Sequence, residues 1–429
     1  MSKNQRTYRA PRGIRDLLPE DVALAERMER IAASLATRRG FREIRPALLE
    51  ETALFKRSVG EVTDIVEKEM FSFERGKTHL SLRPEGTAGI VRAYIEAGYP
   101  RNRPIQRFFH IGPMFRYERP QKGRERMFTQ FDVEALGSMD PRLDAEVIQL
   151  AALFFESLGI DEIEVRINSM GDGDDRDRYR DAVRAFLAPS MEAHCDLCRS
   201  RFERNVLRVL DCKNPSCREL HAGAPAIVDF LSPENEAHFA AVRSSLERLG
   251  RKTVLDSGLV RGLDYYTRTV FELHHPPLGV RSALCGGGRY DHLVRDLGGP
   301  DLGAVGFAIG FTPTLLALEE LGILDRPAIR PAADCFLVAA GEGLDEEVFV
   351  LAEELRSRGV SVVFDVEGKS LKSQMKTANA GGFRFALVLG ESELERGVVQ
   401  LKDLPAREQH EIAREELADR ILEALAVPS

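Results

Sequence analysis

The chain has 429 residues, of which 43% are hydrophobic and 30% charged, and its formal net charge is -8. This length predicts about two or three domains, and the composition is that of a soluble globular protein. No run of about eighteen apolar residues occurs, which argues against a membrane-spanning helix. The N-terminal residues are basic but lack an apolar segment, so we expect no secretory signal and a cytoplasmic location.

The first predicted element is a helix over residues 21–39, because apolar residues recur at helical spacing and Gly40 is a stop signal. A strand-like run, FREIRPALLE, follows at residues 41–50. Pro46 lies inside this run, and proline within a strand favours an edge or interface position. The run is therefore either a simple edge strand or part of a dimer interface.

Residues 101–126 contain eight Lys and Arg residues but only two acids. The flanking segments, RFFHIGPMFRYE at 107–118 and MFTQFDVEALG at 127–137, predict two strands joined by a basic loop with a PQKG turn. Such a loop can reach phosphates and the end of an RNA strand, or it can be a solvated hairpin. In the second strand, Gln130, Asp132 and Glu134 alternate, so they should share one sheet face.

Residues 172–250 begin with a polar, turn-rich stretch and then predict an inserted helical module. Four of the six cysteines of the chain lie in this module, at Cys195, Cys198, Cys212 and Cys217. Two close pairs of cysteines separated by a short loop could form a tetrahedral zinc site. The alternative is four reduced thiols in a small insertion.

Two later segments suggest a ligand pocket: LVRGLDYYTRTVFE at 259–272 and CGGGRYD at 285–291. They combine an arginine, two tyrosines and a glycine-rich strand, which suits a small polar, partly aromatic ligand that carries a phosphate. Tyr265 and Tyr266 are adjacent, so on a strand they would face opposite sides and at most one would line the pocket.

The C-terminal part begins after a linker at 326–331 that contains two prolines. Residues 332–429 alternate strand-like and helical segments, which predicts an α/β domain with a mostly parallel sheet. This part holds 11 basic and 19 acidic residues, a poor composition for general nucleic-acid binding. The spacing of Lys369, Lys372 and Lys376 places them on one helix face, which either binds RNA locally or is simply solvated.

The two pocket segments resemble the histidine-specific signatures of histidyl-tRNA synthetases, which are class II aminoacyl-tRNA synthetases. Four further segments fit this family in the same order: RPEGTA at 83–88, GPMFRYERPQKGR at 112–124, TQFDVEALG at 129–137 and SLKSQMKTANAGG at 370–382. The resemblance implies an α+β fold, with an antiparallel sheet flanked by helices and a C-terminal α/β anticodon-binding domain. It implies a catalytic core over 1–325 interrupted by the insertion, an anticodon-binding domain over 332–429, and a homodimer.

The activity that this resemblance implies has two steps, for which ATP and Mg²⁺ are required. Histidine reacts with ATP to give histidyl-adenylate, and the histidyl group then passes to the 3′ end of its tRNA. Arg116 and Arg261 match the catalytic arginines at the α-phosphate of ATP, and Glu118 matches a position near the adenine and ribose.

The resemblance also implies a histidine pocket formed by Glu85, Thr87, Gln130, Glu134, Tyr265, Tyr266 and Tyr290. Within this pocket, Glu85, Thr87 and Gln130 match the positions that hold the α-amino group. Glu134 and Tyr266 match those that bind the imidazole. A carboxylate and a phenol can satisfy both ring nitrogens, so an apolar isostere would be rejected. Gln121 and Arg124 in the basic loop, and the three lysines named above, are the candidate tRNA contacts.

One position departs from the family pattern. The third class II motif usually carries an arginine near the start of its helix, and here the matching residue is Pro313. Proline suits a first helical turn but cannot bind a phosphate. Either another basic residue, such as Arg124 or Arg126, supplies the missing charge at ATP, or ATP binds more weakly.

Two alternatives to a histidine–tRNA ligase remain at this point. One is a non-charging, synthetase-like regulatory subunit of ATP phosphoribosyltransferase in histidine biosynthesis, which Pro313 favours. The intact pocket signatures, the basic loop and the C-terminal domain favour the ligase. The other is an RNA-binding module without catalysis, against which the retained Glu85, Arg116 and Arg261 argue.

Overall fold

The computed structural model describes residues 8–60, 63, 65–121, 123–210, 212, 214–259, 265–324 and 333–426. The chain divides into two compact units, Met1–Arg326 and Pro327–Ser429. Each unit has its own hydrophobic core. Within the described ranges, no helix combines the length and apolar character needed to cross a bilayer.

The first unit is built on an eight-stranded sheet with the order β1-β5-β6-β11-β10-β9-β7-β8. From β5 to β7 all neighbouring strands are antiparallel, and only the edge strands β1 and β8 pair in parallel. This confirms the expected antiparallel sheet. The strands are β1 (Arg42–Glu43), β5 (Gln106–Phe115), β6 (Met127–Leu136), β7 (Glu164–Ser169), β8 (Thr253–Leu255), β9 (Thr267–His274), β10 (Ala283–Arg289) and β11 (Ala304–Gly310).

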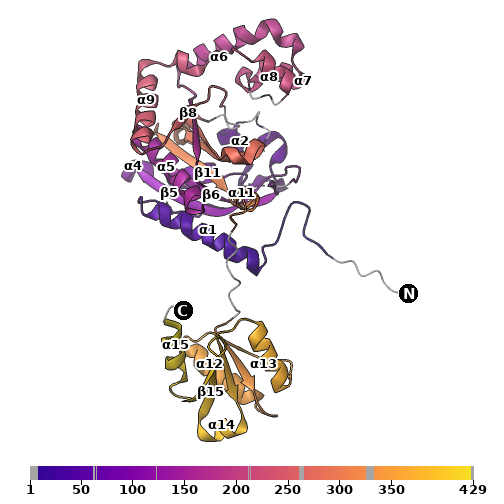
Figure 1. The fold of residues 1–429 in the computed structure, drawn as a ribbon. Helices are drawn as coiled ribbons and strands as arrows, with labels where there is room; N and C mark the ends of the chain where they lie inside the picture. The colour runs from indigo at the N-terminus through magenta and orange to yellow at the C-terminus, as the bar shows by residue number, and fades with distance from the viewer. Residues whose placement is uncertain are drawn as a thin grey trace, which may run out of the picture. The chain divides into compact units, whose positions relative to one another are not determined.

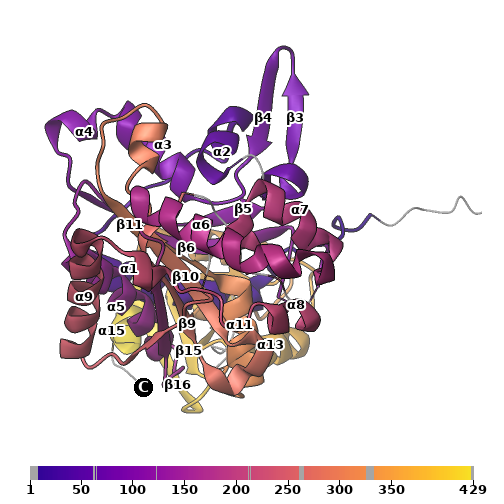
Figure 2. The same ribbon diagram turned by 90° about the horizontal axis from the view of Figure 1, so that it is seen from above.

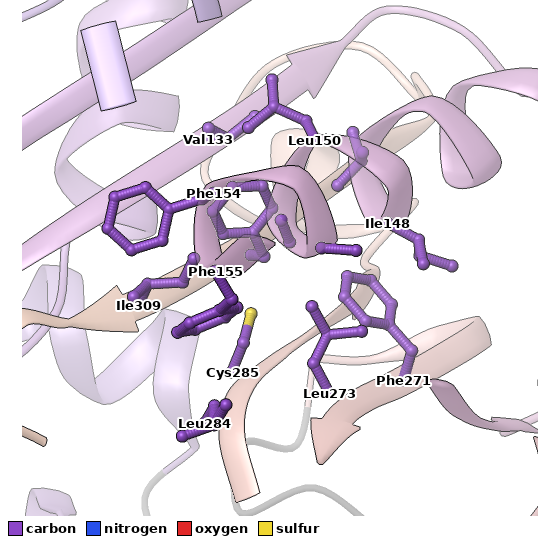
Figure 3. Close-up of a cluster of buried hydrophobic side chains, with 14 of the residues drawn as sticks. Val133, Ile148, Leu150, Phe154, Phe155, Phe271, Leu273, Leu284, Cys285 and Ile309 are labelled. Carbon is purple, nitrogen blue, oxygen red and sulfur yellow. The ribbon is translucent and has the colours of Figure 1, made fainter. Parts of the chain in front are cut away.

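One face of this sheet is covered by helices and holds the main hydrophobic core. Because side chains alternate along a strand, Phe131 and Val133 of β6 enter this core, whereas Asp132 and Glu134 face the opposite side. Figure 3 shows Phe155 of α5 near Cys285 of β10, and Phe154 belongs to the same core. The helices on this face are α1 (Pro19–Thr37), α5 (Pro141–Ser157), α9 (Pro233–Arg248) and α11 (Phe311–Glu320).

A buried charge network ties α5 to the sheet. The α5 helix begins after Asp140, whose side chain accepts a hydrogen bond from the Arg142 amide at 2.9 Å. Arg289 of β10 is fully buried and forms ion pairs with Asp144 of α5 at 2.9 Å and with Asp291 at 2.6 Å. Because the Arg289 side chain points toward α5, the side chain of the next residue, Tyr290, can point to the opposite face of the sheet.

The opposite face of the sheet carries shorter helices and a second, three-stranded sheet with the order β2-β4-β3. Figure 2 shows β3 and β4 as a hairpin that extends beyond α2. The predicted strand at 41–50 is wrong as a single element: β1 and β2 are separate, and Pro46 between them has no amide to donate. These elements are β2 (Leu49–Glu51), α2 (Thr52–Val59), η1 (Ile65–Glu69), β3 (Ser72–Arg75), β4 (Thr78–Leu82), α3 (Thr87–Glu96), α4 (Tyr99–Asn102) and α10 (Leu293–Asp296). The short helix η5 (Pro276–Arg281) instead contributes Leu278 to the main core.

The insertion is helical, as expected, and has a small core of its own. Figure 1 shows α6, α7 and α8 gathered at one end of the first unit. Phe239, Val242 and Leu246 of α9 pack into the main core instead, so the separate body of the insertion ends before α9. Its elements are α6 (Asp174–Leu187), η2 (Ala188–Ala193), α7 (Asp196–Arg204), η3 (Val206–Val209), α8 (Pro215–Leu220) and η4 (Ile227–Phe230).

The second unit contains a five-stranded sheet with the order β13-β12-β14-β15-β16. Its first three strands are parallel, but β15 and β16 are antiparallel, so the expected mostly parallel sheet is mixed. The β16 sequence EQHEIA is almost wholly exposed and polar, so it lacks the apolar alternation that marks a strand. The elements are β12 (Cys335–Ala339), α12 (Asp345–Ser357), β13 (Val362–Phe364), α13 (Leu371–Ala380), β14 (Phe385–Leu389), α14 (Glu391–Arg396), β15 (Val398–Asp403), β16 (Glu408–Ala413) and α15 (Leu417–Ala426).

Candidate active site

The site begins at the N-terminus of α3, on the open face of the large sheet. The Glu85 carboxylate accepts hydrogen bonds from the amides of Thr87 at 2.8 Å and Ala88 at 2.9 Å. These are unpaired donors of the first helical turn, and they favour a negative charge. Burial has the larger, opposite effect and raises the pKa of Glu85.

The Glu134 carboxylate on β6 receives two hydroxyl groups from different elements. Thr87 Oγ1 donates to Glu134 Oε1 at 2.6 Å, and the Tyr290 hydroxyl donates to Glu134 Oε2. Burial raises the pKa of Glu134 well above its usual range. Gly306 is the β11 residue opposite Glu134, and a Cβ atom there would meet Glu134 Oε2 at 1.8 Å. Only glycine at this position leaves the carboxylate in place.

Two further acceptors lie on the same face of β6. Gln130 and Asp132 are buried, and Gln130 Oε1 and Asp132 Oδ2 have no hydrogen-bond partner in the described part of the chain. Burial, followed by the charge of Glu85, raises the pKa of Asp132 well above its usual range. Buried acceptors without donors are costly, so this face is suited to a ligand that brings donors or a positive charge.

Aromatic rings enclose these carboxylates. The rings of Tyr265 and Tyr266 are 4.8 Å apart, and that of Tyr290 is 5.5 Å from Tyr265. The prediction that Tyr265 and Tyr266 face opposite sides of a strand is wrong, because β9 begins only at Thr267. In the irregular segment before the strand, the two rings can pack together.

Arg116 lies at the end of β5, where its Nε donates to the Pro84 carbonyl at 2.8 Å. Its guanidinium lies over the Phe128 ring, 5.3 Å from the centroid. The Arg116 charge lowers the pKa of both Glu85 and Asp132, although burial outweighs it at each. Arg116 is therefore near the carboxylate cluster. Arg261, the second predicted catalytic arginine, lies outside the described residues.

The basic loop places its side chains along one edge of this region. Arg124 forms an ion pair with Glu118 at 3.4 Å, and its backbone pairs with Gln121 in a tight turn. Arg126 lies over the Tyr117 ring at 3.7 Å and donates to the Glu118 carbonyl at 3.2 Å. Contacts among its own residues therefore hold the loop, and Arg126 also donates to the Arg12 carbonyl at 3.3 Å.

Pro313 occupies the first turn of α11, as expected from its sequence position. The neighbouring Thr312 donates to Glu125 of the basic loop at 3.0 Å. The helix start and the basic loop therefore touch, which brings the loop arginines into the region of the missing third-motif arginine.

The sequence interpretation assigned no role to three buried residues beside the site: Arg83, His110 and Asp132. Arg83 donates to the carbonyls of Pro46 and Pro113, both at 2.9 Å. Burial and the Arg83 charge lower the pKa of His110 to about 4, which keeps this imidazole neutral. Only the alternation of β6, which puts Asp132 between two site residues, could have identified any of them from sequence.

The lysines of the second unit do not form the expected single helix face. Lys372 and Lys376 lie on α13, but Lys369 precedes the helix and forms an ion pair with Glu367 at 2.7 Å. The prediction of a common face for all three is wrong because Ser370 is the N-cap residue and ends the helical geometry on that side.

The predicted metal ligands do come together in the insertion. Ligand atoms of Cys195, Cys198, Cys212 and Cys217 all lie within 4.8 Å of one another, and Cys198, Cys212 and Cys217 are buried. Among the residues described, no other group of three or more potential metal ligands is found.

Comparisons with known families agree over nearly the whole chain. A family model for histidyl-tRNA synthetase matches residues 13–171 and 194–313, and one for an anticodon binding domain matches 334–424. A histidine–tRNA ligase of Moorella thermoacetica is 46% identical over 404 residues, covering 94% of this chain and 95% of the relative. One of Desulfotalea psychrophila is 44% identical over 417 residues, covering 97% and 95%.

Solved structures show the same likeness. The structure of an apo histidyl-tRNA synthetase from S. aureus has a TM-score of 0.80 and 35% identity, covering 97% of this chain and all of that one. A structure from Bacillus halodurans described as an ATP phosphoribosyltransferase regulatory subunit/histidyl-tRNA synthetase has a TM-score of 0.62 and 23% identity. The match covers 90% of this chain and 99% of the Bacillus halodurans chain. At that identity it shows a shared fold only.

Proposed function

Because the chain belongs to the histidyl-tRNA synthetase family, we propose that it activates histidine with ATP and transfers the histidyl group to the 3′ end of its tRNA. The observation that carries this proposal is the buried cluster of Glu85, Asp132 and Glu134, enclosed by tyrosines. An α-ammonium group and an imidazole N–H are donors of the kind that such a cluster requires.

In the proposed pocket, the amino group of histidine lies near Glu85, Thr87 and Gln130. Glu134 accepts from the imidazole, and the phenols of Tyr265, Tyr266 and Tyr290 enclose the ring. Glu134 already receives hydroxyl donors from Thr87 and Tyr290, so its orientation is fixed before the ligand arrives. Such preorganisation limits the entropy that binding costs.

Arg116 and Arg261 are proposed to neutralise the α-phosphate as the histidine carboxylate attacks the phosphorus. This step needs positioning and charge neutralisation rather than covalent help from the protein. We propose that Glu118 lies near the adenine and ribose. Mg²⁺ would arrive with the phosphates of ATP, because it prefers phosphate and water oxygens to an all-protein cage.

The loop arginines are proposed to compensate for Pro313. We expect Arg126→Ala to raise the KM for ATP about tenfold, which is about 1.4 kcal/mol and close to the lower end for one hydrogen bond to a charged group. The KM for histidine should change little. Pyrophosphate exchange at varied ATP measures this, with Arg124→Ala beside it, since Arg124 is the other candidate. Unchanged ATP kinetics in both variants would contradict compensation by this loop.

The second unit is proposed to be the anticodon-binding domain over residues 332–429, with Lys372 and Lys376 as its RNA contacts. We expect Lys372→Glu to raise the KM for tRNA about tenfold at moderate salt, because one phosphate contact becomes a repulsion. Adenylate formation should be unaffected. Arg420→Glu, on α15 of the same unit, is the matched charge reversal. Equal losses in charging and in pyrophosphate exchange would refute the assignment.

Histidine-dependent ATP–pyrophosphate exchange, run beside charging of the histidine tRNA, tests the proposal as a whole. Activity in both assays supports the ligase. Histidine binding without exchange would instead support a regulatory subunit. The relatives at 42–46% identity are named as ligases, which argues against that alternative. We also propose a cytoplasmic homodimer.

A further inference from the structure

The four cysteines of the insertion come from separate local elements. Cys195 is the N-cap residue of α7 and Cys198 lies within that helix, whereas Cys212 follows η3 and Cys217 lies in α8. The sulfurs of Cys195 and Cys212 are 3.9 Å apart, and the Cys195 amide donates to the Cys217 sulfur at 3.4 Å. All six cysteines of the chain are free thiols, so no disulfide explains this convergence.

The helices that carry these cysteines have almost no apolar face. In α7, the nine-residue segment DLCRSRFER, the only buried residue is Cys198. In α8, the six-residue segment PSCREL, the only buried residue is Cys217. A surface helix normally attaches through an apolar stripe of three or four residues per two turns. The only other apolar side chain of the two helices that packs against the small core of the insertion is Phe202 of α7, which is partly buried. Each helix therefore depends strongly on its cysteine for attachment.

We propose that Cys195, Cys198, Cys212 and Cys217 bind one zinc ion as four thiolates, and that this ion holds α7, η3 and α8 together. Four sulfur ligands fill a tetrahedral zinc site and leave no open position, so the site is structural and not catalytic. Binding releases the thiol protons, and the ion then replaces the apolar contacts that the two helices lack. The amide of Cys195 provides a hydrogen bond to a thiolate, a typical outer contact of such sites.

The zinc-bound segment also touches the catalytic core. Arg204 at the end of α7 forms an ion pair with Glu67 of η1 at 3.6 Å. The amide of Tyr117, at the start of the basic loop, donates to the carbonyl of Glu69 in the same short helix at 2.6 Å. The zinc site therefore lies two contacts from the loop proposed to approach ATP and tRNA. The metal proposal itself is independent of the proposed aminoacylation activity.

The first test is the metal content of the untagged full-length chain, purified with a thiol reductant and measured by elemental analysis. We expect about one zinc ion per chain, retained on dialysis without chelator. Replacement by cobalt should give the intense visible absorption of tetrahedral thiolate coordination. A visible iron chromophore, or four freely titratable thiols with no bound metal, would overturn the proposal.

Cysteine variants separate metal loss from general misfolding. Cys198→Ser and Cys217→Ser should each lower the zinc content at least about tenfold, because a structural site needs all four ligands. Cys285→Ala and Cys335→Ala, which remove buried thiols outside the cluster, should retain it. If Cys198→Ser does not fold, chelator-dependent exposure of α7 and α8 in the unaltered chain replaces it, read by hydrogen exchange. Full zinc content in both serine variants, or exchange that chelator leaves unchanged, would contradict the site.

Discussion

Arg116→Ala is expected to lower kcat for histidine-dependent pyrophosphate exchange about 10³-fold, a loss of about 4 kcal/mol. Of the two proposed catalytic arginines, Arg116 is the one that the structure describes. Its guanidinium group is held by the Pro84 carbonyl and the Phe128 ring. The positive charge of Arg116 should interact more strongly with the phosphoryl group in the transition state, where that group carries more negative charge. Alanine removes this interaction. The loss should therefore appear in kcat more than in the KM for histidine.

Two further variants make this result specific. Arg116→Lys keeps the charge but loses the planar fork, so only part of the activity should return. Arg119→Ala removes an exposed arginine three residues away and should leave exchange close to that of the unaltered protein. Equal loss in Arg119→Ala would show that the general positive charge of the loop matters, rather than the position of Arg116.

Glu134→Ala is expected to lower kcat/KM for histidine about 10³-fold, mainly through KM. The change leaves the hydroxyl groups of Thr87 and Tyr290 without their acceptor, and the imidazole of the bound histidine loses its partner as well. Each unsatisfied buried donor costs about 1–3 kcal/mol. Steady-state exchange at varied histidine measures the effect, and the KM for ATP should change much less.

Glu134→Gln distinguishes binding from stability. Burial raises the pKa of Glu134, so this carboxyl lowers the stability of the fold once the unfolded state can ionise. The cost grows as pH rises from the unfolded-state pKa to the folded-state pKa and is constant above it. Glutamine keeps an acceptor without the charge. We therefore expect an unchanged or higher melting temperature together with weaker histidine binding. The control is Glu146→Gln, because Glu146 is a half-buried carboxylate that forms an ion pair with Arg107 at 2.9 Å. This variant makes the same substitution away from the proposed histidine pocket. A melting temperature that falls together with histidine affinity would indicate a structural role for Glu134.

Much of the first unit was predictable because its signals are local. The apolar spacing of α1, the two strands around the basic loop, and the alternation of Gln130, Asp132 and Glu134 all depend on residues close in sequence. Where a segment lacked such a signal, the prediction failed. Tyr265 and Tyr266 were assigned to a strand that begins only at Thr267, and the polar strand β16 gave no apolar alternation.

The sequence by itself determined the chemistry that is available: the arginines, the carboxylates, the tyrosines and the four cysteines, each in a motif of recognisable spacing. Only the tertiary structure decided which of them meet. The contacts from Glu134 to Thr87 and to Tyr290 join residues 47 and 156 positions apart. The start of α3 and the end of β10 must both come to β6 for these contacts to form. The same packing removes water from three carboxylates at once, and that raises their pKa values and creates the need for a positively charged ligand. Burial depends on the whole fold, so no local pattern could have revealed it.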